Sequence, residues 1–374
     1  MHGVRRGAQA SSDLAEQRAA EERYIRLGEE AGRVLASRYA DDTQKFLSDS
    51  ARVLRENPEE YSLWNRRREI LLEALRHRPF DPQATLSPLP KTAAEAFEEE
   101  LALSAQALQS NPKAYAAWAH RVWLLRVCSG VGDHSGARPS SYAAQALRKE
   151  LQLCERVLQM DDRNFLVWAH RMLILRLMQH AAIPLNDSIE DAASASVASS
   201  IREATLHFTL SKLLRNSSNY SAYHYRSVLG VRDVHPEGVL DLREELDLVH
   251  NAIFTEPNDQ SAWFYLQWLL RECTASVSNG VGGQPGMSST GVRPVPALDL
   301  ADELNLIEEL LRLTPGARWA VHARANILCH LSRHDEALTL YRDVLPALDP
   351  PRAGMYRDLA TKMEQRAPST LGNS

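Results

Sequence analysis

Cysteine is scarce in this sequence, and its distribution excludes two common kinds of site. The chain has 374 residues and only four cysteines, none of them close to another. No C-x-x-C pair occurs, so the sequence predicts neither a zinc ribbon nor a thioredoxin-like redox centre, and no metal site in this chain. Isolated cysteines of this kind are typical of buried thiols in a reducing cytosol. The four are Cys128, Cys154, Cys273 and Cys329.

Long apolar runs and an excess of positive charge are also missing. No run of about 20 apolar residues occurs, which predicts that the chain has no transmembrane segment. The start, "MHGVRRGAQASSDLAEQ", lacks the apolar core of a signal peptide, so we expect a cytoplasmic protein. A formal net charge of -5 argues against nucleic acid as a partner, because no excess of cations is available to displace phosphate counterions.

What the sequence does contain is a repeated helical pattern. Apolar residues recur at three and four positions between glycine- and proline-rich joints, which predicts an all-α fold. Five segments follow the pattern N-P-x-x-Y/F-x-x-W-x-x-R, the first two at every position and the next three with substitutions, and a sixth is weaker. Their spacing is uneven, which argues against a strict array of tetratricopeptide repeats of about 34 residues and favours helical hairpins with variable loops. The six are "NPEEYSLWNRRREILLEAL", "NPKAYAAWAHRVWLL", "DDRNFLVWAHRMLIL", "NSSNYSAYHYRSVLG", "EPNDQSAWFYLQWLL" and "TPGARWAVHARANIL".

Each repeat predicts a helix that begins after turn chemistry. In the second copy, Asn111 is expected to be the N-cap and Pro112 the first helical residue. Tyr115 and Trp118 then share one helical face with apolar residues further along. A hairpin of two such helices cannot bury its apolar face alone, so neighbouring hairpins must stack. The sequence therefore predicts a right-handed superhelix, or crescent, of stacked antiparallel helical hairpins with a concave face suited to a partner.

The predicted domain organisation follows from composition. We expect a flexible N-terminus at 1–11, a hairpin-repeat domain at 12–273 that resumes at 298–366, and a flexible tail at 367–374. Residues 274–297 are rich in glycine, serine and proline and are predicted to be a disordered linker. Two further inserts, from Gly130 and from Pro184, are predicted to be surface loops.

The residues repeated in every copy are assigned to the fold. The tryptophans are expected in the core, and the arginines are expected to bind a carboxylate or a helix-end carbonyl. Histidines beside those arginines, His120, His170 and His224, are expected to tie adjacent hairpins, since a catalytic histidine is seldom copied three times. The structural repeat residues are Trp64, Trp118, Trp168, Tyr223, Trp263, Arg67, Arg121, Arg171 and Arg226.

Lys113 does not fit a purely structural role. It is predicted to lie in the first turn of its helix, where the helix dipole disfavours a cation by about 0.3–1 kcal/mol. Free N–H groups together with an ammonium suit a phosphate, and Arg163 is the equivalent residue one repeat later. The alternative is that both side chains simply point into solvent. No G-x-S-x-G, H-E-x-x-H, P-loop or kinase signature offers another site.

These repeats resemble those of protein prenyltransferase alpha subunits over most of the chain. The segments "SNYSAYHYRSVL" and "DPPRAGMYRDLATK" are most similar to the Rab (type II) geranylgeranyltransferase branch. The resemblance implies a heterodimer with a catalytic beta subunit that holds a zinc ion. That enzyme transfers geranylgeranyl from geranylgeranyl diphosphate to C-terminal cysteines of Rab GTPases, which a Rab escort protein presents. Some members of that family carry extra domains in the region of Thr274, whereas here only the glycine-, serine- and proline-rich linker is present, so we expect a minimal form.

The resemblance assigns roles to particular residues. Lys113 matches the lysine that approaches the diphosphate, Tyr115 the aromatic beside it, and Asn164, with Arg163, the substrate edge. Ala116 stands where farnesyltransferase-type subunits have a glutamine that grips a C-a-a-X carboxylate, which favours the Rab type. Two further positions are Leu166, where relatives often have a histidine, and His2, a conceivable ligand of the partner's zinc.

Two alternatives stay open at this point. The chain could be the shared alpha subunit of farnesyltransferase and geranylgeranyltransferase type I. It could also be a helical-repeat adaptor that has no transferase partner.

Overall fold

The structure is a computed structural model of the whole chain, and it confirms the all-α hairpin prediction. It describes residues 8–36, 43–76, 79–87, 89–130, 140–185, 194–231, 238–279 and 299–366. His2, most of the insert after Gly130 and residues 280–298 lie outside these ranges. Within the described residues, no helix is both long and apolar enough to cross a membrane.

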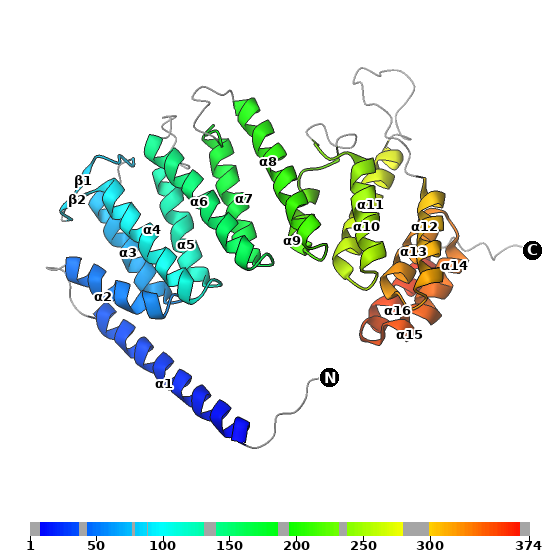
Figure 1. Cartoon of the computed structure of the whole chain (residues 1–374), viewed down its shortest axis with the longest axis horizontal. Helices are drawn as coiled ribbons and strands as arrows, with labels where there is room; N and C mark the ends of the chain where they lie inside the picture. Colours follow the sequence, from blue (N-terminus) through cyan, green and yellow to red (C-terminus); the bar gives the residue numbers. More distant parts are fainter. Residues whose placement is uncertain are drawn as a thin grey trace, which may run out of the picture. The chain divides into compact units, whose positions relative to one another are not determined.

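The chain divides into two compact units, Met1–Ile201 and Arg202–Ser374, whereas the sequence predicts one repeat domain with a linker insert. The division falls inside α8 (Ser194–Arg215). In the first unit, helices pack as antiparallel neighbours, α4 against α5 and α6 against α7 (Figure 1). Its helices are α1 (Ala8–Ala36), α2 (Thr43–Glu56), α3 (Tyr61–Leu75), α4 (Ala93–Ser110), α5 (Tyr115–Cys128), α6 (Ser141–Met160) and α7 (Phe165–His180).

A short β-hairpin precedes α4 and fixes where that helix begins. Strands β1 (Thr85–Leu86) and β2 (Lys91–Thr92) pair antiparallel, with Thr85 opposite Thr92. Thr92 is also the N-cap of α4: its hydroxyl accepts from the Glu95 N–H, and the Glu95 carboxylate accepts from the Thr92 N–H. This reciprocal capping satisfies two N–H groups that a helix start would leave unpaired.

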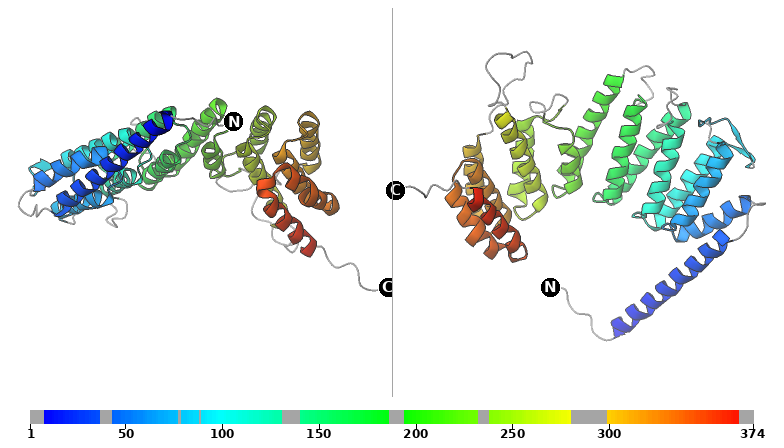
Figure 2. Two further views of the ribbon diagram at one scale, coloured as in Figure 1. Left: turned by 90° about the horizontal axis from the view of Figure 1, so that it is seen from below. Right: turned by 180° about the vertical axis from the view of Figure 1, so that it is seen from behind.

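The second unit continues the hairpin pattern with α10 against α11 and α12 against α13 (Figures 1 and 2).

Two predicted loop boundaries differ from those in the structure, because helical periodicity continues through small polar residues. The insert from Pro184 ends at Ser194, where α8 begins, and α11 runs to Asn279, beyond the expected linker start at Thr274. The helices are α9 (Tyr220–Ser227), α10 (Leu242–Thr255), α11 (Gln260–Asn279), α12 (Leu300–Leu313), α13 (Arg318–His330), α14 (His334–Thr339), η1 (Leu340–Val344), α15 (Leu345–Leu348), η2 (Pro350–Arg352) and α16 (Ala353–Arg366).

In the part of the chain that the structure describes, the six repeat hairpins turn through a four-residue loop with the same two hydrogen bonds. The turn is therefore regular, although the spacing between copies in the sequence is uneven. The first loop residue donates its N–H to the carbonyl four positions earlier, and the fourth donates to the carbonyl of the first. In the second copy these bonds are Asn111 to Ala107 at 3.2 Å and Ala114 to Asn111 at 3.1 Å. The six loops are 57–60, 111–114, 161–164, 216–219, 256–259 and 314–317.

The predicted helix start at Asn111 is wrong by three residues. Asn111 ends α4 instead, and its side-chain oxygen accepts from the Lys113 N–H at 3.0 Å, which closes an Asx turn. The N-cap of α5 is Ala114, so Pro112 and Lys113 lie in the loop. Side-chain capping occurs at the fourth loop position in other copies, where Asn164 and Asn219 each accept from an N–H three residues later.

The tryptophans of the repeat join the loop to the core. Trp64, Trp118, Trp168 and Trp263 are buried, and each indole N–H donates to the carbonyl six residues earlier at 2.8–3.0 Å. One side chain therefore fills the core and also fixes the turn that leads into its helix. The first aromatic of the motif behaves differently from the sequence prediction: Tyr115 is 51 % exposed and Phe165 is 55 % exposed.

Candidate functional site

Two kinds of polar side chain recur along the repeats, and the structure separates them. One set is buried between hairpins and holds the fold together. The other set lies on the exposed loops that lead into α5 and α7, where Lys113, Tyr115 and Arg163 are all exposed. Only the second set is accessible to a ligand or a partner, so the buried set has to be identified first.

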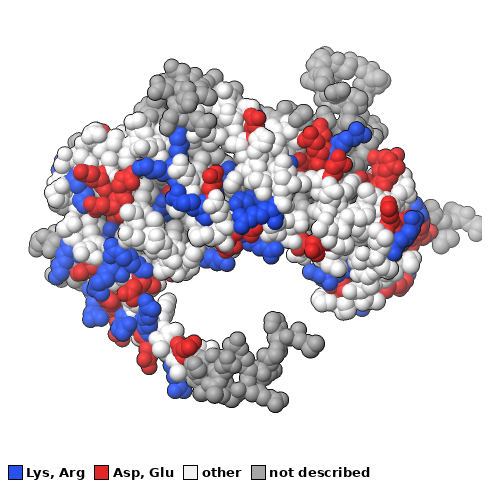
Figure 3. Space-filling view, viewed as in Figure 1, with Lys and Arg blue, Asp and Glu red and all other residues white. Residues whose placement is uncertain are grey.

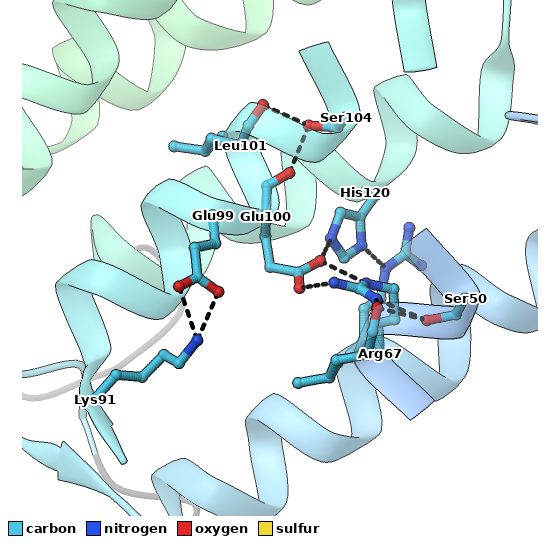
Figure 4. Close-up of polar contacts among 10 residues, drawn as sticks. Ser50, Arg67, Lys91, Glu99, Glu100, Leu101, Ser104 and His120 are labelled. Carbon is cyan, nitrogen blue, oxygen red and sulfur yellow. Dashed lines mark hydrogen bonds and ion pairs between the residues drawn. The ribbon is translucent and has the colours of Figure 1, made fainter. Parts of the chain in front are cut away.

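The buried set is a network of arginine, glutamate and histidine. Arg67 on α3 donates two hydrogen bonds to the carboxylate of Glu100 on α4, at 2.9 and 2.5 Å (Figure 4). Its remaining nitrogen donates to the Leu47 carbonyl and the Ser50 hydroxyl. His120 Nε2 lies 3.0 Å from the same carboxylate. The arginine therefore meets the carboxylate expected from sequence, together with a backbone carbonyl inside α2 rather than at a helix end.

The next repeat builds the same network from equivalent residues. Arg121 donates to both carboxylate oxygens of Glu150, at 2.8 and 2.5 Å, and to the Leu101 carbonyl at 2.6 Å. His170 Nε2 completes it at 2.6 Å from Glu150. All three side chains are buried. Two charged groups taken out of water need such full satisfaction, because each would otherwise cost several kcal/mol.

Electrostatics keep these glutamates ionised despite their burial. Burial would raise the pKa of Glu100, but the Arg67 charge and the hydrogen bonds from His120 and Arg67 lower it to about 2. Burial lowers the pKa of His120, and the Glu100 carboxylate opposes that shift without cancelling it. The network is thus an anionic glutamate held by an arginine and a neutral histidine, which suits a structural role better than proton transfer.

The second unit keeps this network but replaces the histidine. Arg226 is bonded to Glu245, to the Leu206 carbonyl and to Thr209, as in the first unit. The phenol of Tyr265 donates to Glu245 at 2.7 Å, in the place that His120 holds. His224, predicted to tie hairpins, is instead exposed and stacks on Tyr220 with 6.4 Å between ring centroids. It lies one residue earlier in the motif than His120, so its side chain leaves the helix in a direction about 100° away from that of His120.

The sequence patterns predicted no role in the buried network for the glutamates or for Tyr265. The signal was present, since Glu100, Glu150, Glu245 and Glu303 all stand eleven residues before the first loop residue of their copy. In the fourth copy that position is Thr205, and the arginine of the preceding copy, Arg171, is buried with its pKa lowered to about 10 by burial. Buried carboxylates are hard to foresee because glutamate is ordinarily a surface residue.

The exposed set is centred on Lys113. Its ammonium is 3.7 Å from the Asp161 carboxylate, and the lysine side chain is 63 % exposed. Tyr115 begins α5 and lies beside Phe165, which begins α7, with 6.3 Å between ring centroids. An ammonium next to an exposed aromatic pair offers charge for an anion and an apolar surface beside it.

One predicted feature of this site is wrong. The N–H groups at the start of α5 are not free for a phosphate, because the Glu59 carboxylate of the preceding loop accepts from Tyr115 at 2.9 Å and from Ala116 at 3.2 Å. Lys113 itself precedes the helix, so the helix dipole does not set its environment as expected. Any anion here would meet the lysine side chain rather than the helix end.

The remaining predicted site residues have distinct positions. Arg163 is exposed on the next loop. Asn164 is fully buried: it caps α7, and its amide donates to the Pro112 carbonyl at 3.3 Å. It therefore joins the two loops that carry Lys113 and Arg163. Ala116 is buried and Leu166 is half-buried. Within the described residues, no group of three His, Cys, Asp or Glu side chains could hold a metal ion.

Charge on the visible face is mixed in sign. Lys and Arg side chains alternate with Asp and Glu, and uncharged residues separate them (Figure 3). A nucleic-acid-binding surface is expected to carry a broad basic stripe. No such stripe covers the described part of this face.

Comparison with known proteins identifies the repeats. A family model described as the protein prenyltransferase alpha subunit repeat matches residues 97–128, 147–178 and 242–273. The chain therefore contains protein prenyltransferase alpha subunit repeats. The three matched ranges contain hairpins α4–α5, α6–α7 and α10–α11. The other three hairpins share the same loop, which extends the family's repeat beyond the matched segments.

Curated relatives show which prenyltransferase alpha subunits this chain is similar to. The chain is 36% identical over 281 residues to "Geranylgeranyl transferase type-2 subunit alpha" of Bos taurus, a match covering 72% of this chain and 42% of that protein. The protein of that name in Schizosaccharomyces pombe is 30% identical over 193 residues, covering 47% of this chain and 53% of the relative. The chain thus spans less than half the length of the mammalian relative.

A solved structure supports the fold. "Candida albicans protein geranylgeranyltransferase-I complexed with GGPP" superposes with a TM-score of 0.56 and 19% sequence identity. The superposition covers 89% of this chain and 88% of that one. At this identity the likeness concerns the helical architecture alone.

Proposed function

We propose that this chain is the alpha subunit of a heterodimeric Rab geranylgeranyltransferase. The enzyme would transfer geranylgeranyl from geranylgeranyl diphosphate to C-terminal cysteines of Rab GTPases, with an escort protein presenting the Rab. The observation that carries this proposal is the 36% identity over 281 residues to a geranylgeranyl transferase type-2 alpha subunit. The chain would be active only together with a beta subunit.

The chemistry proposed for this chain is charge stabilisation by Lys113. Loss of a diphosphate leaving group builds negative charge on its oxygens, and a positioned cation lowers the barrier to that step. Lys113 is exposed, and among the described residues its ammonium contacts the Asp161 carboxylate at 3.7 Å, a contact loose enough for the ammonium to turn toward an anion. Tyr115, two residues on, would flank the same group, with Arg163 on the neighbouring loop adding positive charge.

Asn164 takes a positioning role in this scheme rather than a contact role. Its side chain is buried and joins the loop of Pro112 to the start of α7. The loop that carries Lys113 is thereby fixed against the loop that carries Arg163.

Zinc is assigned to the beta subunit. The ion would activate the acceptor cysteine as a thiolate when bound there. This chain offers no metal-binding cluster among its described residues, and its proposed part is to stabilise the diphosphate and to support its partner.

Ala116 supports the Rab-type assignment. It is buried at the start of α5, and its methyl group can make no hydrogen bond to a peptide carboxylate. A C-a-a-X substrate would need a polar side chain at that position, as the resemblance to farnesyltransferase-type subunits implies.

The test is co-expression with candidate beta subunits, followed by assay of the purified complex. We expect a zinc-containing heterodimer that transfers geranylgeranyl to a Rab only when an escort protein is present. Failure to form such a heterodimer contradicts the proposal. Efficient use of a C-a-a-X peptide without escort contradicts the Rab-type assignment.

A variant tests the site itself. Lys113→Ala should lower the transfer rate of the heterodimer by about 10- to 1,000-fold, the range for loss of one charge-stabilising group. Lys149→Ala is the matched control, since Lys149 is also exposed and also faces a carboxylate, that of Glu98 at 3.4 Å. Equal rates for the two variants would remove Lys113 from the mechanism.

A further inference from the structure

The second unit contains a groove that the proposed transfer chemistry does not use. A cavity of about 460 Å³ lies among α11, α13 and α16, with Phe264, Leu270, Trp319 and Met355 among its lining residues. A second cavity of about 280 Å³ lies between α9 and α11. Both are lined by Phe264, Gln267 and Arg271, so they adjoin along one face of α11. We call the two together the α11 groove.

Two arginines line the α11 groove, although the chain as a whole is acidic. Arg271 and Arg352 line the larger cavity together with His322 and His330, and neither cavity is lined by an aspartate or a glutamate. Arg271 is exposed and forms no ion pair with any described residue. A groove of one sign concentrates field between low-dielectric walls and favours a ligand of the opposite sign.

Arg352 is positioned by two neighbours. Its guanidinium is 4.9 Å from the centroid of the Trp319 ring and 2.8 Å from the Asp349 carboxylate. That carboxylate is shared, because the Tyr356 phenol also donates to it at 2.9 Å. The arginine side chain remains 37% exposed, so part of its five-donor fork is open to a second acceptor.

The groove also contains an unsatisfied buried donor. The indole nitrogen of Trp319 is buried and has no hydrogen-bond partner among the described residues. The four repeat tryptophans, by contrast, each donate to a loop carbonyl. In the last copy the repeat position is Val321, and the tryptophan stands two residues earlier, so it does not occupy the position from which the other four donate to their loops. An unpaired buried donor costs about 1–3 kcal/mol and calls for an explanation.

His322 adds a donor on the same wall. Gln267 on α11 lies 2.9 Å from its Nδ1, and burial lowers its pKa to about 4, against the opposing charge of Asp349. The ring is therefore neutral at pH 7. With the Gln267 amide donating to Nδ1, the imidazole proton is on Nε2. The groove wall thus presents donors and cations, with aromatic rings between them.

We propose that the α11 groove binds an acidic peptide segment of a partner protein. Its carboxylates would pair with Arg271 and Arg352, and an apolar side chain between them would pack on Phe264, Trp319 and Met355. Two adjoining cavities along one helix suit an extended segment better than a compact ion, and the apolar walls need an apolar side chain to fill them. This inference concerns binding alone and does not depend on transferase activity.

The test uses the full chain labelled with ¹⁵N at tryptophan, in the form in which it purifies. The probe is the peptide acetyl-EFELE-amide, and the neutral peptide acetyl-QFQLQ-amide is its counterpart. We expect the Trp319 indole signal, assigned with Trp319→Phe, to move on titration with the acidic peptide and not with the neutral one. Arg271→Gln should weaken binding at least 10-fold, whereas Arg312→Gln, an exposed arginine outside the groove, should leave it unchanged.

Three results would overturn the proposal. The first is no movement of the Trp319 signal up to about 1 mM peptide, a concentration that detects binding as weak as about -4 kcal/mol. The second is equal binding of the acidic and neutral peptides, or of the Arg271→Gln and Arg312→Gln chains. The third is saturation of the same signal by sodium pyrophosphate with displacement of the peptide, which would make the groove a phosphate site.

Discussion

Hairpins α4–α5 and α12–α13 are built from the same turn, but their polar interiors differ. In α4–α5, Arg121 is buried and fully bonded to Glu150, and Trp118 donates to the Pro112 carbonyl. In α12–α13, the equivalent arginine, Arg324, makes a half-exposed contact with Glu308 at 3.1 Å. The repeat position holds Val321 instead of an aromatic residue, and the Trp319 indole has no acceptor in the part of the chain that the structure describes. In α4–α5 the repeat arginine and tryptophan are both hydrogen-bonded, whereas in α12–α13 the Trp319 indole nitrogen has no partner among the described residues and Trp319 lines a cavity.

The comparison also shows how the fold tolerates a missing arginine. Leu266 stands at the arginine position of the fifth copy, but Glu303 of the next helix is still buried. His250 takes over, with its Nε2 3.0 Å from the Glu303 carboxylate. A buried carboxylate thus keeps a partner even when the repeat pattern changes, because an unpaired one would be strongly destabilising.

The largest expected effect comes from removing the buried arginine of a complete repeat. Arg121→Ala should lower the free energy of unfolding by about 3–5 kcal/mol, since it leaves the Glu150 charge buried without its partner. Arg324→Ala, at the same repeat position but half-exposed, should cost less than about 1 kcal/mol. Urea unfolding of the two variants checks the contrast. Equal losses would mean that the buried network does not distinguish the repeats.

The second prediction concerns the pH ranges over which the two hairpins lose stability. His322 has its pKa lowered by burial from 6.5 to about 4, so the unfolded chain binds a proton first as the pH falls. Stability of α12–α13 should therefore decrease between pH 6.5 and pH 4, by up to about 3 kcal/mol. Glu100, whose pKa is about 2, should hold its contribution until the pH falls below 4.5.

Hydrogen exchange of peptides from α13 and from α4 measures these two ranges. His322→Phe should flatten the loss in α13 above pH 4, and His330→Phe, an exposed histidine on the same helix, should not. A pH-independent α13 between pH 6.5 and pH 4 would contradict the assignment.

A smaller effect contrasts two tryptophans. Trp118→Phe removes a hydrogen bond to Pro112 together with part of a packed ring, and should cost about 1–3 kcal/mol. Trp319→Phe removes no hydrogen bond and relieves an unpaired donor, so its cost should be smaller. Thermal unfolding of the paired variants provides the measurement. A larger loss for Trp319→Phe would show that its indole nitrogen has an acceptor after all.

The smallest effect concerns the exposed site. Asp161→Asn removes the carboxylate near Lys113 but keeps the oxygen that accepts from the Arg163 N–H, so stability should change by less than about 0.5 kcal/mol. Asp161→Ala also loses that turn bond and should cost about 1 kcal/mol. Calorimetry of both variants checks the order. A large loss for Asp161→Asn would make the Lys113 contact structural.

Much of the architecture could be predicted from the sequence. The helical period, the six copies and the core tryptophans follow from spacing alone, because a helix repeats its face every 3.6 residues. The arginine partners were predictable in kind, since a guanidinium in a repeated core position needs a carboxylate or a carbonyl. The loop was misread: Asn111 closes the preceding helix rather than starting the next, because asparagine favours both positions.

What the sequence determined by itself is the repeat: which residues turn, which fill the core, and which copy carries an added lysine. Only the tertiary structure decided the pairing of these residues across hairpins. Glu59 belongs to the loop of the preceding copy, yet its carboxylate accepts from the N–H groups at the start of α5. An anion beside Lys113 was expected to bind those groups. Trp319 lost its acceptor through a shift of two positions. Local periodicity fixes the face of a helix, but a hydrogen bond depends on which atoms the neighbouring hairpin brings within about 3 Å.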